Sequence, residues 1–582
     1  MQDSGLLNEQ MAKTLIKELI HQGVRTFFIA PGARSAPLVT AAAEHPLAET
    51  IVHFDERALG FSALGYAKAK NAPAAIIVTS GTAVANLLPC AIEAAQSQTP
   101  LIILSADRPE DQIDCGANQA IDQKDIFSNY TTWSHHFDTP HAQQNCQAIR
   151  SVAAQAVFRA ASGPVHINCP FRKPLLSENS TASNTPLRAH TIYTKSQLAP
   201  SEDDLMQIAD RMSSIENGVI IVGSMHAWEN AEEIESLARL LQWPIFADIN
   251  SALRSHGNIH GLCRHHDLCI SSLPKHEEMP VEGILHLGGP FVSNPLREWI
   301  AKHSPKTYIH IKSNPSRLDP LHLASHHIQS DPQTCINLLL NHLPGRSPSS
   351  WMHLWNELST VVSQRLNIFL DKQSTISELA ALHALNKLPQ TAAAFIGNSM
   401  PIRDADALFY PKSETGPIFA NRGASGIDGN IATAAGICRA LQKPILAVVG
   451  DQTLLHDIGS LAMLKHLNHP LVILAINNSG GGIFSFLPLA KKQDIFEEHF
   501  AARHTLNFKQ IAQSFNIKYE NPKAISTLQD LIHESLAGVG PTLIEITTDR
   551  RDNFALHREL LDELAGTIPS QKTSPFPAYA NT

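Results

Sequence analysis

The stretch that decides the fold runs from Ala447 to Pro488 and reads AVVGDQTLLHDIGSLAMLKHLNHPLVILAINNSGGGIFSFLP. Two strand-like apolar runs belong to it, Pro444–Gly450, which starts just upstream, and Leu471–Ile476. The segment between them is amphipathic, with these apolar residues on one face: Ile458, Leu461, Leu464 and Leu467. A strand, a helix and a second strand in this order predict a β-α-β unit of a parallel sheet.

A polar cluster follows each of these two strands. Gly450-Asp451 ends the first, and Asn477-Asn478-Ser479-Gly480 ends the second. Parallel strands place their carboxyl ends at one edge of the sheet, where open α/β sheets bind ligands. We therefore expect Asp451 and Asn478 to be neighbours. A carboxylate, an amide oxygen and a glycine-rich turn suit Mg²⁺, which takes oxygen ligands and bridges to phosphates. The alternative is a helix-capping Asp and a simple turn.

Length and composition place the chain among ordinary globular proteins of several domains. At 582 residues it is too long for one core, and three or four domains are expected. The net charge of −9 is spread without long runs, which argues against a nucleic-acid or anionic-membrane partner. No apolar run approaches the ~18 residues of a membrane span, and the N-terminus reads as a helix rather than a signal peptide. Eight cysteines suit a reducing cytoplasm.

Strand and helix patterns alternate along three regions and predict three doubly wound α/β domains with mainly parallel sheets. The expected boundaries are 1–185, 198–343 and 351–565, with a polar linker at 176–197, a second linker at 343–350 and a loose tail at 566–582. The strands expected in the first region are Arg25–Ala30, Ile51–Phe54, Ala74–Thr79, Leu101–Ser105 and Pro164–Asn168. Those of the second are Gly218–Gly223, Pro244–Ala247, Gly283–Leu287 and Tyr308–Ile311. The third adds Ala392–Ile396, Ile418–Ala420 and Thr542–Ile546 to the two strands quoted above.

Further polar residues fall at the expected strand ends. Glu56 opens a helix, where a glutamate is often a helix-dipole partner but also has a tunable pKa. Ser80-Gly81-Thr82 is either a simple helix-start turn or a set of backbone donors for an anion. Five arginines share such positions and suggest a pocket for a polyanionic substrate, although each alone is typical of a surface ion pair: Arg34, Arg57, Arg108, Arg403 and Arg422. Cys263, His265, His266 and Cys269 look like a metal cluster but lack the spacing of a zinc site, so chance clustering is favoured.

Longer motifs resemble the thiamine diphosphate-dependent enzymes over nearly the full length. Within that superfamily the chain most resembles the synthases of 2-succinyl-5-enolpyruvyl-6-hydroxy-3-cyclohexene-1-carboxylate, abbreviated SEPHCHC, in menaquinone biosynthesis. The motifs are IAPGARSAPL (29–38), HFDERALGFSALGYAK (53–68), VTSGTAVANLLP (78–89), SADRPEDQIDCGANQAIDQ (105–123), VHINCPF (165–171), GNSMPIRDAD (397–406), NRGASGIDG (421–429) and NNSGGGIFSFLP (477–488).

The resemblance implies a reaction, its cofactors and a set of site residues. It implies decarboxylation of 2-oxoglutarate and 1,4-addition of the product to isochorismate, with thiamine diphosphate and Mg²⁺ or Mn²⁺. Glu56 would activate the cofactor, and the metal would be bound by Asp451, Asn478 and the carbonyl of Gly480. Further cofactor contacts would be Ser80, Gly81, Ser399, Ile483 and Phe484. Substrate contacts would be Arg34, Arg108, Asn118, Gln119, Ser399, Arg403, Arg422, Phe484 and Leu487.

The sequence departs from the family pattern at three places. Ala33 stands where a serine is usual, and Gln452 replaces the last glycine of the usual Gly-Asp-Gly. Asn294-Pro295 aligns with a basic pair of the middle domain, for which Arg297 is a nearby replacement on a different expected helical face. The alternatives are another carboligase or decarboxylase, such as an acetolactate synthase, and a degenerate regulatory subunit. Glu56 and Asp451 lie on different domains, and the resemblance implies that these domains come from different chains, so a homodimer or homotetramer with sites between chains is expected.

Overall fold

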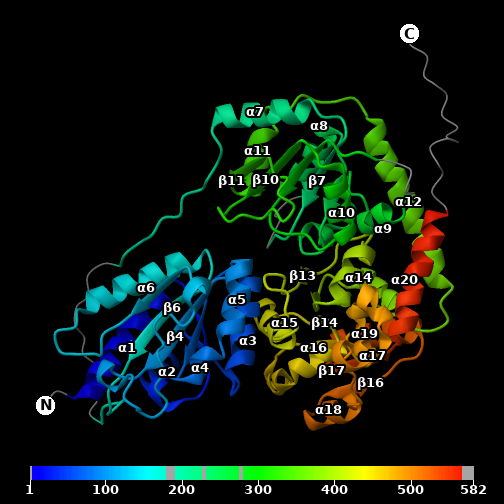
Figure 1. The fold of residues 1–582 in the computed structure, drawn as a ribbon. Helices are drawn as coiled ribbons and strands as arrows, with labels where there is room; N and C mark the ends of the chain where they lie inside the picture. The colour runs from blue at the N-terminus through cyan, green and yellow to red at the C-terminus, as the bar shows by residue number, and fades with distance from the viewer. Residues whose placement is uncertain (1–2, 179–189, 226–230, 274–278, 567–582) are drawn as a thin grey trace, which may run out of the picture.

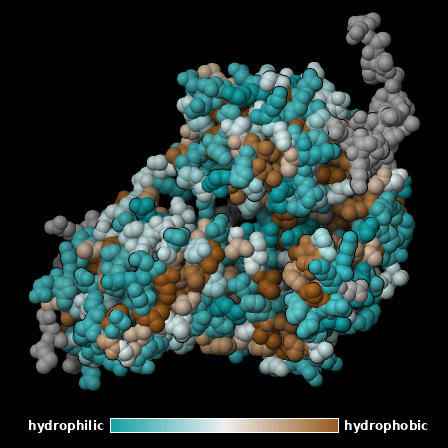
Figure 2. Space-filling view, viewed as in Figure 1, coloured by the Kyte–Doolittle hydropathy of each residue, from teal (hydrophilic) through white to brown (hydrophobic). Residues whose placement is uncertain are grey.

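The computed structural model describes residues 3–178, 190–225, 231–273 and 279–566, which form three α/β units (Figure 1). The predicted tail falls outside these residues except for Gly566, and so does much of the linker predicted at 176–197. In the described part of that linker no helix or strand is formed. Figure 2 shows a largely hydrophilic face with scattered apolar patches over all three units. None of the described helices is both long and apolar enough to cross a membrane.

Each unit is built on one fully parallel sheet, as the alternation of strands and helices predicts. The first sheet has the order β2-β1-β3-β4-β6-β5, and the third has β13-β12-β14-β15-β17-β16, which is the same topology. The middle sheet has the order β11-β10-β9-β7-β8. The strands of the first sheet are β1 (Thr26–Ile29), β2 (Glu49–Val52), β3 (Ala74–Val78), β4 (Leu101–Asp107), β5 (Trp133–His136) and β6 (Val165–Pro170).

The other two sheets contain eleven strands. Those of the middle sheet are β7 (Gly218–Val222), β8 (Ile245–Ala247), β9 (Gly283–Leu287), β10 (Thr307–Lys312) and β11 (His326–Gln329). Those of the third are β12 (Ala393–Ile396), β13 (Ile418–Phe419), β14 (Ile445–Gly450), β15 (Leu471–Asn477), β16 (Lys518–Glu520) and β17 (Thr542–Thr547). The prediction missed one strand in each sheet, β5, β11 and β16, and all three are edge strands.

Helices cover the sheets of all three units. In the first unit they are α1 (Ser4–His21), α2 (Ala36–Ala43), α3 (Glu56–Lys70), α4 (Thr82–Ala85), α5 (Leu88–Ser97) and α6 (Cys146–Ala160). In the middle unit they are α7 (Glu202–Ser213), α8 (Glu232–Leu241), α9 (His266–Ser271), α10 (Asn294–His303) and α11 (Pro332–Leu339). In the third they are α12 (Ser350–Asp371), α13 (Glu378–His383), α14 (Met400–Leu408), α15 (Asn430–Leu441), α16 (Asp451–His456), α17 (Gln493–Ile495), α18 (Phe508–Ser514), α19 (Ile525–Ala537) and α20 (Arg550–Ala565).

The β-α-β unit of the opening stretch is present, with one difference. β14 and β15 pair in parallel, with Gly450 opposite Ile476. The connection is not one α-helix: the short α16 ends at His456, and a 3₁₀ segment follows from Ile458 to His466. Gly459 lies in this segment, and a glycine inside a helical pattern weakens the α-helix. Leu461 and Leu464 are still buried, as the amphipathic pattern predicts.

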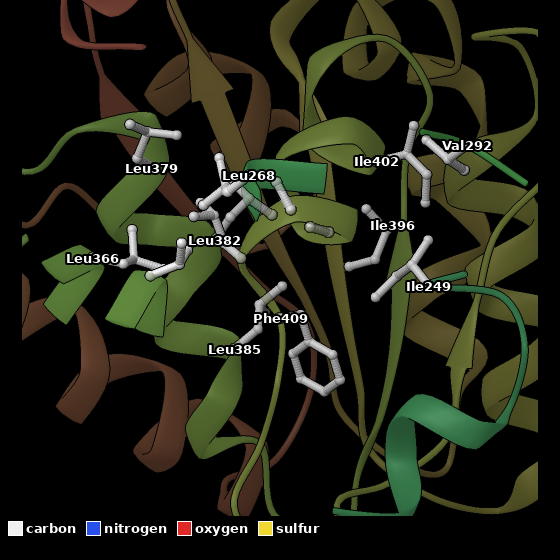
Figure 3. Close-up of a cluster of buried hydrophobic side chains, with 14 of the residues drawn as sticks. Ile249, Leu268, Val292, Leu366, Leu379, Leu382, Leu385, Ile396, Ile402 and Phe409 are labelled. Atoms are coloured by element: carbon white, nitrogen blue, oxygen red, sulfur yellow. The ribbon is translucent and has the colours of Figure 1, made fainter. Parts of the chain in front are cut away.

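The third unit packs against both others. Its apolar core continues into the middle unit, where Ile249 and Val292 meet Ile402 and Phe409 (Figure 3). A second core joins it to the first unit through α3 and α15. These two helices approach closely, because a Cβ atom on Gly65 would lie 2.0 Å from the Thr433 carbonyl oxygen. A Cβ on Gly436 would lie 1.9 Å from the Ser62 carbonyl oxygen, so both positions require glycine.

Candidate active site

The carboxyl edge of the third sheet brings the two polar clusters of the opening stretch together. Asp451 begins α16 directly after β14, and Asn478 follows β15. The backbone N–H of Gly480 donates to Asp451 Oδ2 at 2.8 Å. Asp451 Oδ1 accepts from the N–H of Gln452 at 2.6 Å. The carboxylate is therefore fixed by backbone donors from both strand ends.

Asp451 is a buried acid in an environment that suits a cation. Its side chain is almost fully buried, and burial raises its pKa, although the two backbone hydrogen bonds partly offset this. The Nε2 atom of His504 lies 3.2 Å from Asp451 Oδ2. A divalent ion beside the carboxylate would favour its charged form and reduce the cost of its burial.

Asn478 presents an unsatisfied oxygen at the same place. Its Oδ1 atom is buried and has no hydrogen-bond partner among the described residues. Its Nδ2 atom donates to Glu378 Oε1 at 3.0 Å. A buried acceptor without a partner costs about 1–3 kcal/mol, so an oxygen-seeking cation would satisfy it. The donor set of Asp451, Asn478 and a backbone carbonyl thus fits Mg²⁺.

The turn after Asn478 can only be formed with glycine. Gly480 has a φ of +146°, and a Cβ atom there would lie 2.3 Å from the carbonyl oxygen of Ala501. The Gly480 carbonyl accepts from the N–H of Gly482 at 2.9 Å. Gln452, at the position that departs from the family pattern, donates from Nε2 to the carbonyls of Ala501 and Ala502 at 3.1 and 3.2 Å. It therefore links α16 to the segment that ends in His504.

The apolar residues predicted for the cofactor lie just beyond this turn. Ile483 and Phe484 are in a 3₁₀ segment, Gly482–Phe486, and are partly buried. Leu487 ends the segment and is 44% exposed. The Phe484 ring packs edge-on against Phe500. These side chains form an apolar rim next to Asp451 and Asn478.

Glu56 lies at the first position of α3, at the carboxyl edge of the first sheet. The preceding Asp55 caps the helix by accepting from the N–H groups of Arg57 and Ala58. Glu56 is partly buried, and its side chain forms no hydrogen bond or ion pair with any residue the structure describes. The adjacent Arg57 donates to the carbonyl of His456 at 3.1 Å, at the far end of α16 from Asp451. Arg57 is therefore engaged in an intrachain contact.

Two arginines share the edge of the first sheet. Arg34 and Arg108 are both buried, and Arg34 donates to the carbonyl of Phe171 at 2.6 Å. Arg108 donates to the carbonyl of Asn118 and to Ser80 Oγ. Burial lowers the pKa of Arg34, and the charge of Arg108 lowers it further. Neither guanidinium is ion-paired with a carboxylate in the described part of the chain, so both are available to an anion.

The Ser80-Gly81 turn is held by glutamines. Gln119 donates from Nε2 to the carbonyl of Ser80 at 2.9 Å, and its backbone has a φ of +59°. The N–H of Gly81 donates to Gln123 Oε1 at 2.9 Å. Gln123 is buried and also donates to Asn168. The Gly81 donor proposed for an anion is thus engaged by Gln123, while the side chains of Asn118 and Gln119 are exposed.

Ser399, Arg403 and Arg422 surround the carboxyl ends of β12 and β13. Ser399 precedes α14 with a φ of +75°, a conformation that non-glycine residues rarely adopt and that is typical of functional sites. Arg422 donates to Asn398 Oδ1 at 2.8 Å. Partial desolvation lowers the pKa of Arg403, and the charges of Arg422 and Arg297 add to this. No ion pair with a carboxylate is formed by Arg403 or Arg422 among the residues described.

The loop that carries Arg422 is fastened to the first unit. Glu93 of α5 accepts from the N–H groups of Gly423 and Ala424 at 2.9 and 2.6 Å. Lys68 of α3 donates to the carbonyl of Ala420 at 2.8 Å and lies 3.7 Å from Glu93. Neither residue was assigned a role from the sequence: Lys68 ends the quoted motif 53–68, and Glu93 lies outside the motifs.

In the Cys263–Cys269 cluster the two histidines are hydrogen-bonded to residues of the third unit. His265 hydrogen-bonds to the carbonyl of Ala407, and His266 to the hydroxyl of Tyr410, so both attach the middle unit to the third. Among the described residues no group of three or more His, Cys, Asp or Glu residues is arranged to hold a metal ion. All eight cysteines are free.

The three units match thiamine pyrophosphate enzyme families. The first match, described as "Thiamine pyrophosphate enzyme, N-terminal TPP binding domain", covers residues 9–126. The second, "Middle domain of thiamine pyrophosphate", covers 182–396. The third, "Thiamine pyrophosphate enzyme, C-terminal TPP binding domain", covers 405–546.

Curated relatives match the chain from end to end. A protein of Rubrobacter xylanophilus is 38% identical over 568 residues, which is 96% of this chain and 99% of that one. A Salinibacter ruber protein is 36% identical over 94% of this chain and 95% of its own. A Bacillus velezensis protein is 34% identical over 94% and 96%, respectively. All three are named 2-succinyl-5-enolpyruvyl-6-hydroxy-3-cyclohexene-1-carboxylate synthase.

Proposed function

The chain belongs to the SEPHCHC synthase family, and from this premise we propose that it decarboxylates 2-oxoglutarate and adds the resulting succinyl group to isochorismate in a 1,4 sense. The product would be SEPHCHC, a menaquinone precursor, with release of CO₂. The observation that carries the proposal is the full-length match to relatives of that name. The acetolactate synthase-like alternative is not favoured by any of these relatives.

The residues at the third sheet fit the cofactor that the family uses. Thiamine diphosphate would supply the carbon chemistry of the reaction when bound. Asp451, Asn478 Oδ1 and the Gly480 carbonyl would hold Mg²⁺ or Mn²⁺ and, through it, the diphosphate. Ile483 and Phe484 would exclude water from the cofactor, and Ser399, Ser80 and Gly81 would contact it. Glu56 would hold or accept a proton beside the pyrimidine ring.

Arginines that form no ion pair with a carboxylate among the described residues support the proposal of two dicarboxylate substrates. 2-Oxoglutarate and isochorismate each carry two carboxylates, and guanidinium groups bind carboxylates with paired hydrogen bonds. One group, Arg34 and Arg108, lies on the first unit with Asn118 and Gln119. The other, Arg403 and Arg422, lies on the third with Ser399. Phe484 and Leu487 are proposed as further substrate contacts of the third unit. Arg297 of α10 adds a third positive charge to the second group, where the family's basic pair is replaced by Asn294-Pro295.

Replacing Arg422 by alanine should raise the KM for one of the two substrates about 10- to 100-fold, because a hydrogen bond to a charged group is worth about 1.5–3 kcal/mol. Lysine should recover part of the loss, since it keeps the charge but not the paired geometry. Steady-state kinetics with each substrate varied in turn would measure this. Arg365→Ala, on the exposed face of α12, is the control. An unchanged KM for both substrates in Arg422→Ala would contradict the assignment.

A homodimer or homotetramer would complete the site. Glu56 and Asp451 lie on different units, and Glu56 forms no contact with Asp451 or Asn478 in the described chain. Apolar side chains are exposed next to Glu56, where Val52 is 60% and Phe54 67% exposed. At the rim of the third unit Leu487 is 44% and Ile495 50% exposed. A second copy of the chain would cover these surfaces.

Sedimentation should therefore give at least twice the chain mass of 63.5 kDa. Phe54→Asp should shift the protein toward the monomer and lower turnover in proportion, because it puts a charge into the contact. An active monomer would refute the shared site.

The charge, the cysteine content and the strand and helix pattern of the sequence support the remaining assignments. We propose a cytoplasmic location and no nucleic-acid partner. We also propose the boundaries 1–185, 198–343 and 351–565 for the pyrimidine-binding, middle and diphosphate-binding domains.

The decisive experiment mixes the purified protein with thiamine diphosphate, Mg²⁺, 2-oxoglutarate and isochorismate. Loss of isochorismate that requires every component is the expected result. Absence of that loss, with carboligation of pyruvate instead, would favour the acetolactate synthase-like alternative.

A further inference from the structure

Glu378 is a buried acid that contacts Asn478 of the predicted metal site and lies outside the sequence motifs quoted above. It is the first residue of α13 and only 2% exposed. Its position is fixed locally, because Ser377 caps the helix by accepting from the N–H of Ala380. A carboxylate in such a place is costly unless it has hydrogen-bond donors. The structure supplies two.

Both donors come from the ends of neighbouring strands and meet one oxygen. Asn478 donates from Nδ2 to Glu378 Oε1 at 3.0 Å, and Thr548 donates from Oγ1 to the same atom at 2.9 Å. Asn478 follows β15 and Thr548 follows β17, which pair with Asn477 opposite Thr547. The N–H of Thr548 also donates to the carbonyl of Asn477 at 3.0 Å. Glu378 therefore holds two strand ends together.

The chemistry of this contact decides which way the Asn478 amide faces. Glu378 Oε1 accepts from both the Thr548 hydroxyl and the Asn478 amide nitrogen, so the carboxyl group is met by the amide nitrogen and not by the amide oxygen. The oxygen must then point to the other side, and there Oδ1 is buried without a hydrogen-bond partner among the described residues. Asp451 and Gly480 lie at the same edge. The one unsatisfied oxygen of Asn478 is thus presented where the cation is expected.

We propose that Glu378 is the positioning residue of the metal site, which holds Asn478 with its amide oxygen presented to the divalent cation. This inference rests on the proposed function, because it assumes a Mg²⁺ site at Asp451 and Asn478. Partners that orient metal ligands commonly change metal affinity about 10- to 100-fold when they are lost.

The test compares Glu378→Gln with a matched control. Glutamine has the same shape and its amide oxygen can still accept from Asn478 Nδ2, but its amide nitrogen can also donate to Asn478 Oδ1, the oxygen that the cation needs. The Mg²⁺ concentration for half-maximal thiamine diphosphate binding, measured by calorimetry on the full chain, should rise about tenfold or more. Glu545→Gln is the control: Glu545 is buried and accepts from Nδ2 of the adjacent Asn477 at 2.7 Å. That variant should stay within about threefold of the parent.

Exchanging the carboxyl and amide groups of Glu378 and Asn478 distinguishes a role of Glu378 in orienting Asn478 from a role in packing. Asn478→Asp alone sets two carboxylates against each other and should bind Mg²⁺ weakly. In the double variant Asn478→Asp with Glu378→Gln, the glutamine can donate to the new carboxylate, so Mg²⁺ affinity should recover relative to Asn478→Asp. If Glu378 has only a structural role, the double variant should show no recovery of Mg²⁺ affinity, and folded Glu378→Gln should have an unchanged Mg²⁺ midpoint. Either result overturns the proposal. If the parent binds thiamine diphosphate without any divalent ion, the metal site itself is refuted.

Discussion

Glu56→Gln will lower turnover by roughly 10²- to 10⁴-fold, the range expected when a positioned acid–base group is lost. Glutamine keeps the size of the side chain but cannot take up or release a proton. Glu56 has no hydrogen bond or ion pair within the described chain, so the substitution removes no contact that stabilises the fold. Binding of thiamine diphosphate and Mg²⁺ should persist, because Asp451 and Asn478 are untouched. Single-turnover consumption of isochorismate would measure the change.

The control for Glu56→Gln should reproduce its effect on the helix. Removing a first-turn charge costs about 0.3–1 kcal/mol of helix-dipole energy. Glu202 occupies the same first position in α7 of the middle unit, so Glu202→Gln removes a first-turn charge far from the site, together with a contact to His342 at 3.2 Å. Both variants should unfold at nearly the parent temperature, and only Glu56→Gln should lose turnover. Full activity of Glu56→Gln would show that another group performs the proton transfer.

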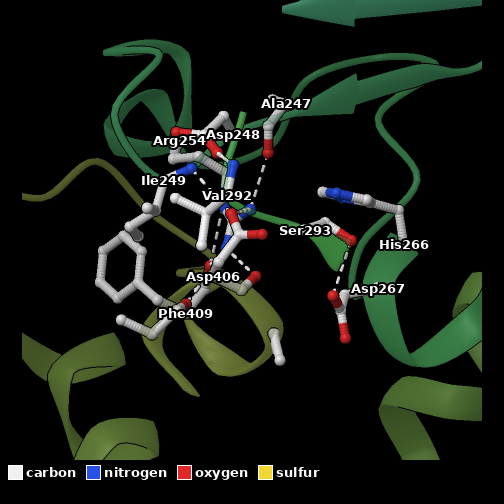
Figure 4. Close-up of polar contacts among 12 residues, drawn as sticks. Ala247, Asp248, Ile249, Arg254, His266, Asp267, Val292, Ser293, Asp406 and Phe409 are labelled. Atoms are coloured by element: carbon white, nitrogen blue, oxygen red, sulfur yellow. Dashed lines mark hydrogen bonds and ion pairs between the residues drawn. The ribbon is translucent and has the colours of Figure 1, made fainter. Parts of the chain in front are cut away.

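The second large effect is expected at Arg254, which joins the middle and third units. Arg254 is 2% exposed and donates to the carbonyls of Ala247, Asp406 and Phe409. Its guanidinium also stacks 3.5 Å from the Tyr410 ring centroid. The buried carboxylates of Asp406 and Asp248 lie around it (Figure 4). Burial raises the pKa of Asp406 well above its usual range, and the charge of Asp248 raises it further.

Arg254→Met should therefore destabilise the protein by about 3–5 kcal/mol, because it leaves buried acids without their cation. The loss should grow with pH. A carboxyl whose pKa is raised by folding opposes folding increasingly as pH rises from its unfolded pKa to its folded pKa. Denaturant unfolding at pH 5 and pH 8 would measure both effects. Arg365→Met, at an exposed position of α12, should change stability by less than about 0.5 kcal/mol. Equal stability losses at both pH values would contradict the role of the acids.

The sequence predicts the sheets well where apolar runs mark the strands. The alternation of strand and helix predicts a parallel sheet in each unit but not the strand order, because the middle unit alternates in the same way and has a different order. The missed edge strands read WSHH, HHIQ and KYE, which have no apolar signal because edge strands face solvent on one side. The continuous helix expected before β15 is broken near Gly459, where local backbone preference outweighs the amphipathic pattern.

The sequence predicts which residues of the candidate site follow strands, but it does not predict the side-chain contacts around them. Asp451 and Asn478 each follow an apolar strand, so their place at one edge could be inferred from topology. Glu378 and Arg254 could not, since no motif marks them and each has partners 100 or more residues away along the chain, Asn478 for Glu378 and Asp406 for Arg254. The same holds for Glu93 and the loop of Arg422, which are 330 residues apart. The contacts of Arg254 and Glu93 depend on how two units dock, and those of Glu378 depend on how α13 packs on the third sheet.

The close approach of α3 and α15 has a consequence for exchanging parts between relatives. With Gly65 and Gly436 each facing a carbonyl of the other helix, the first and third units behave as a matched pair rather than as separate modules. A chimaera that takes its first unit from a relative should fold only if it brings a compatible α15 surface with it. Recombination within this family is therefore expected to move these two units together and to treat the middle unit as the exchangeable part.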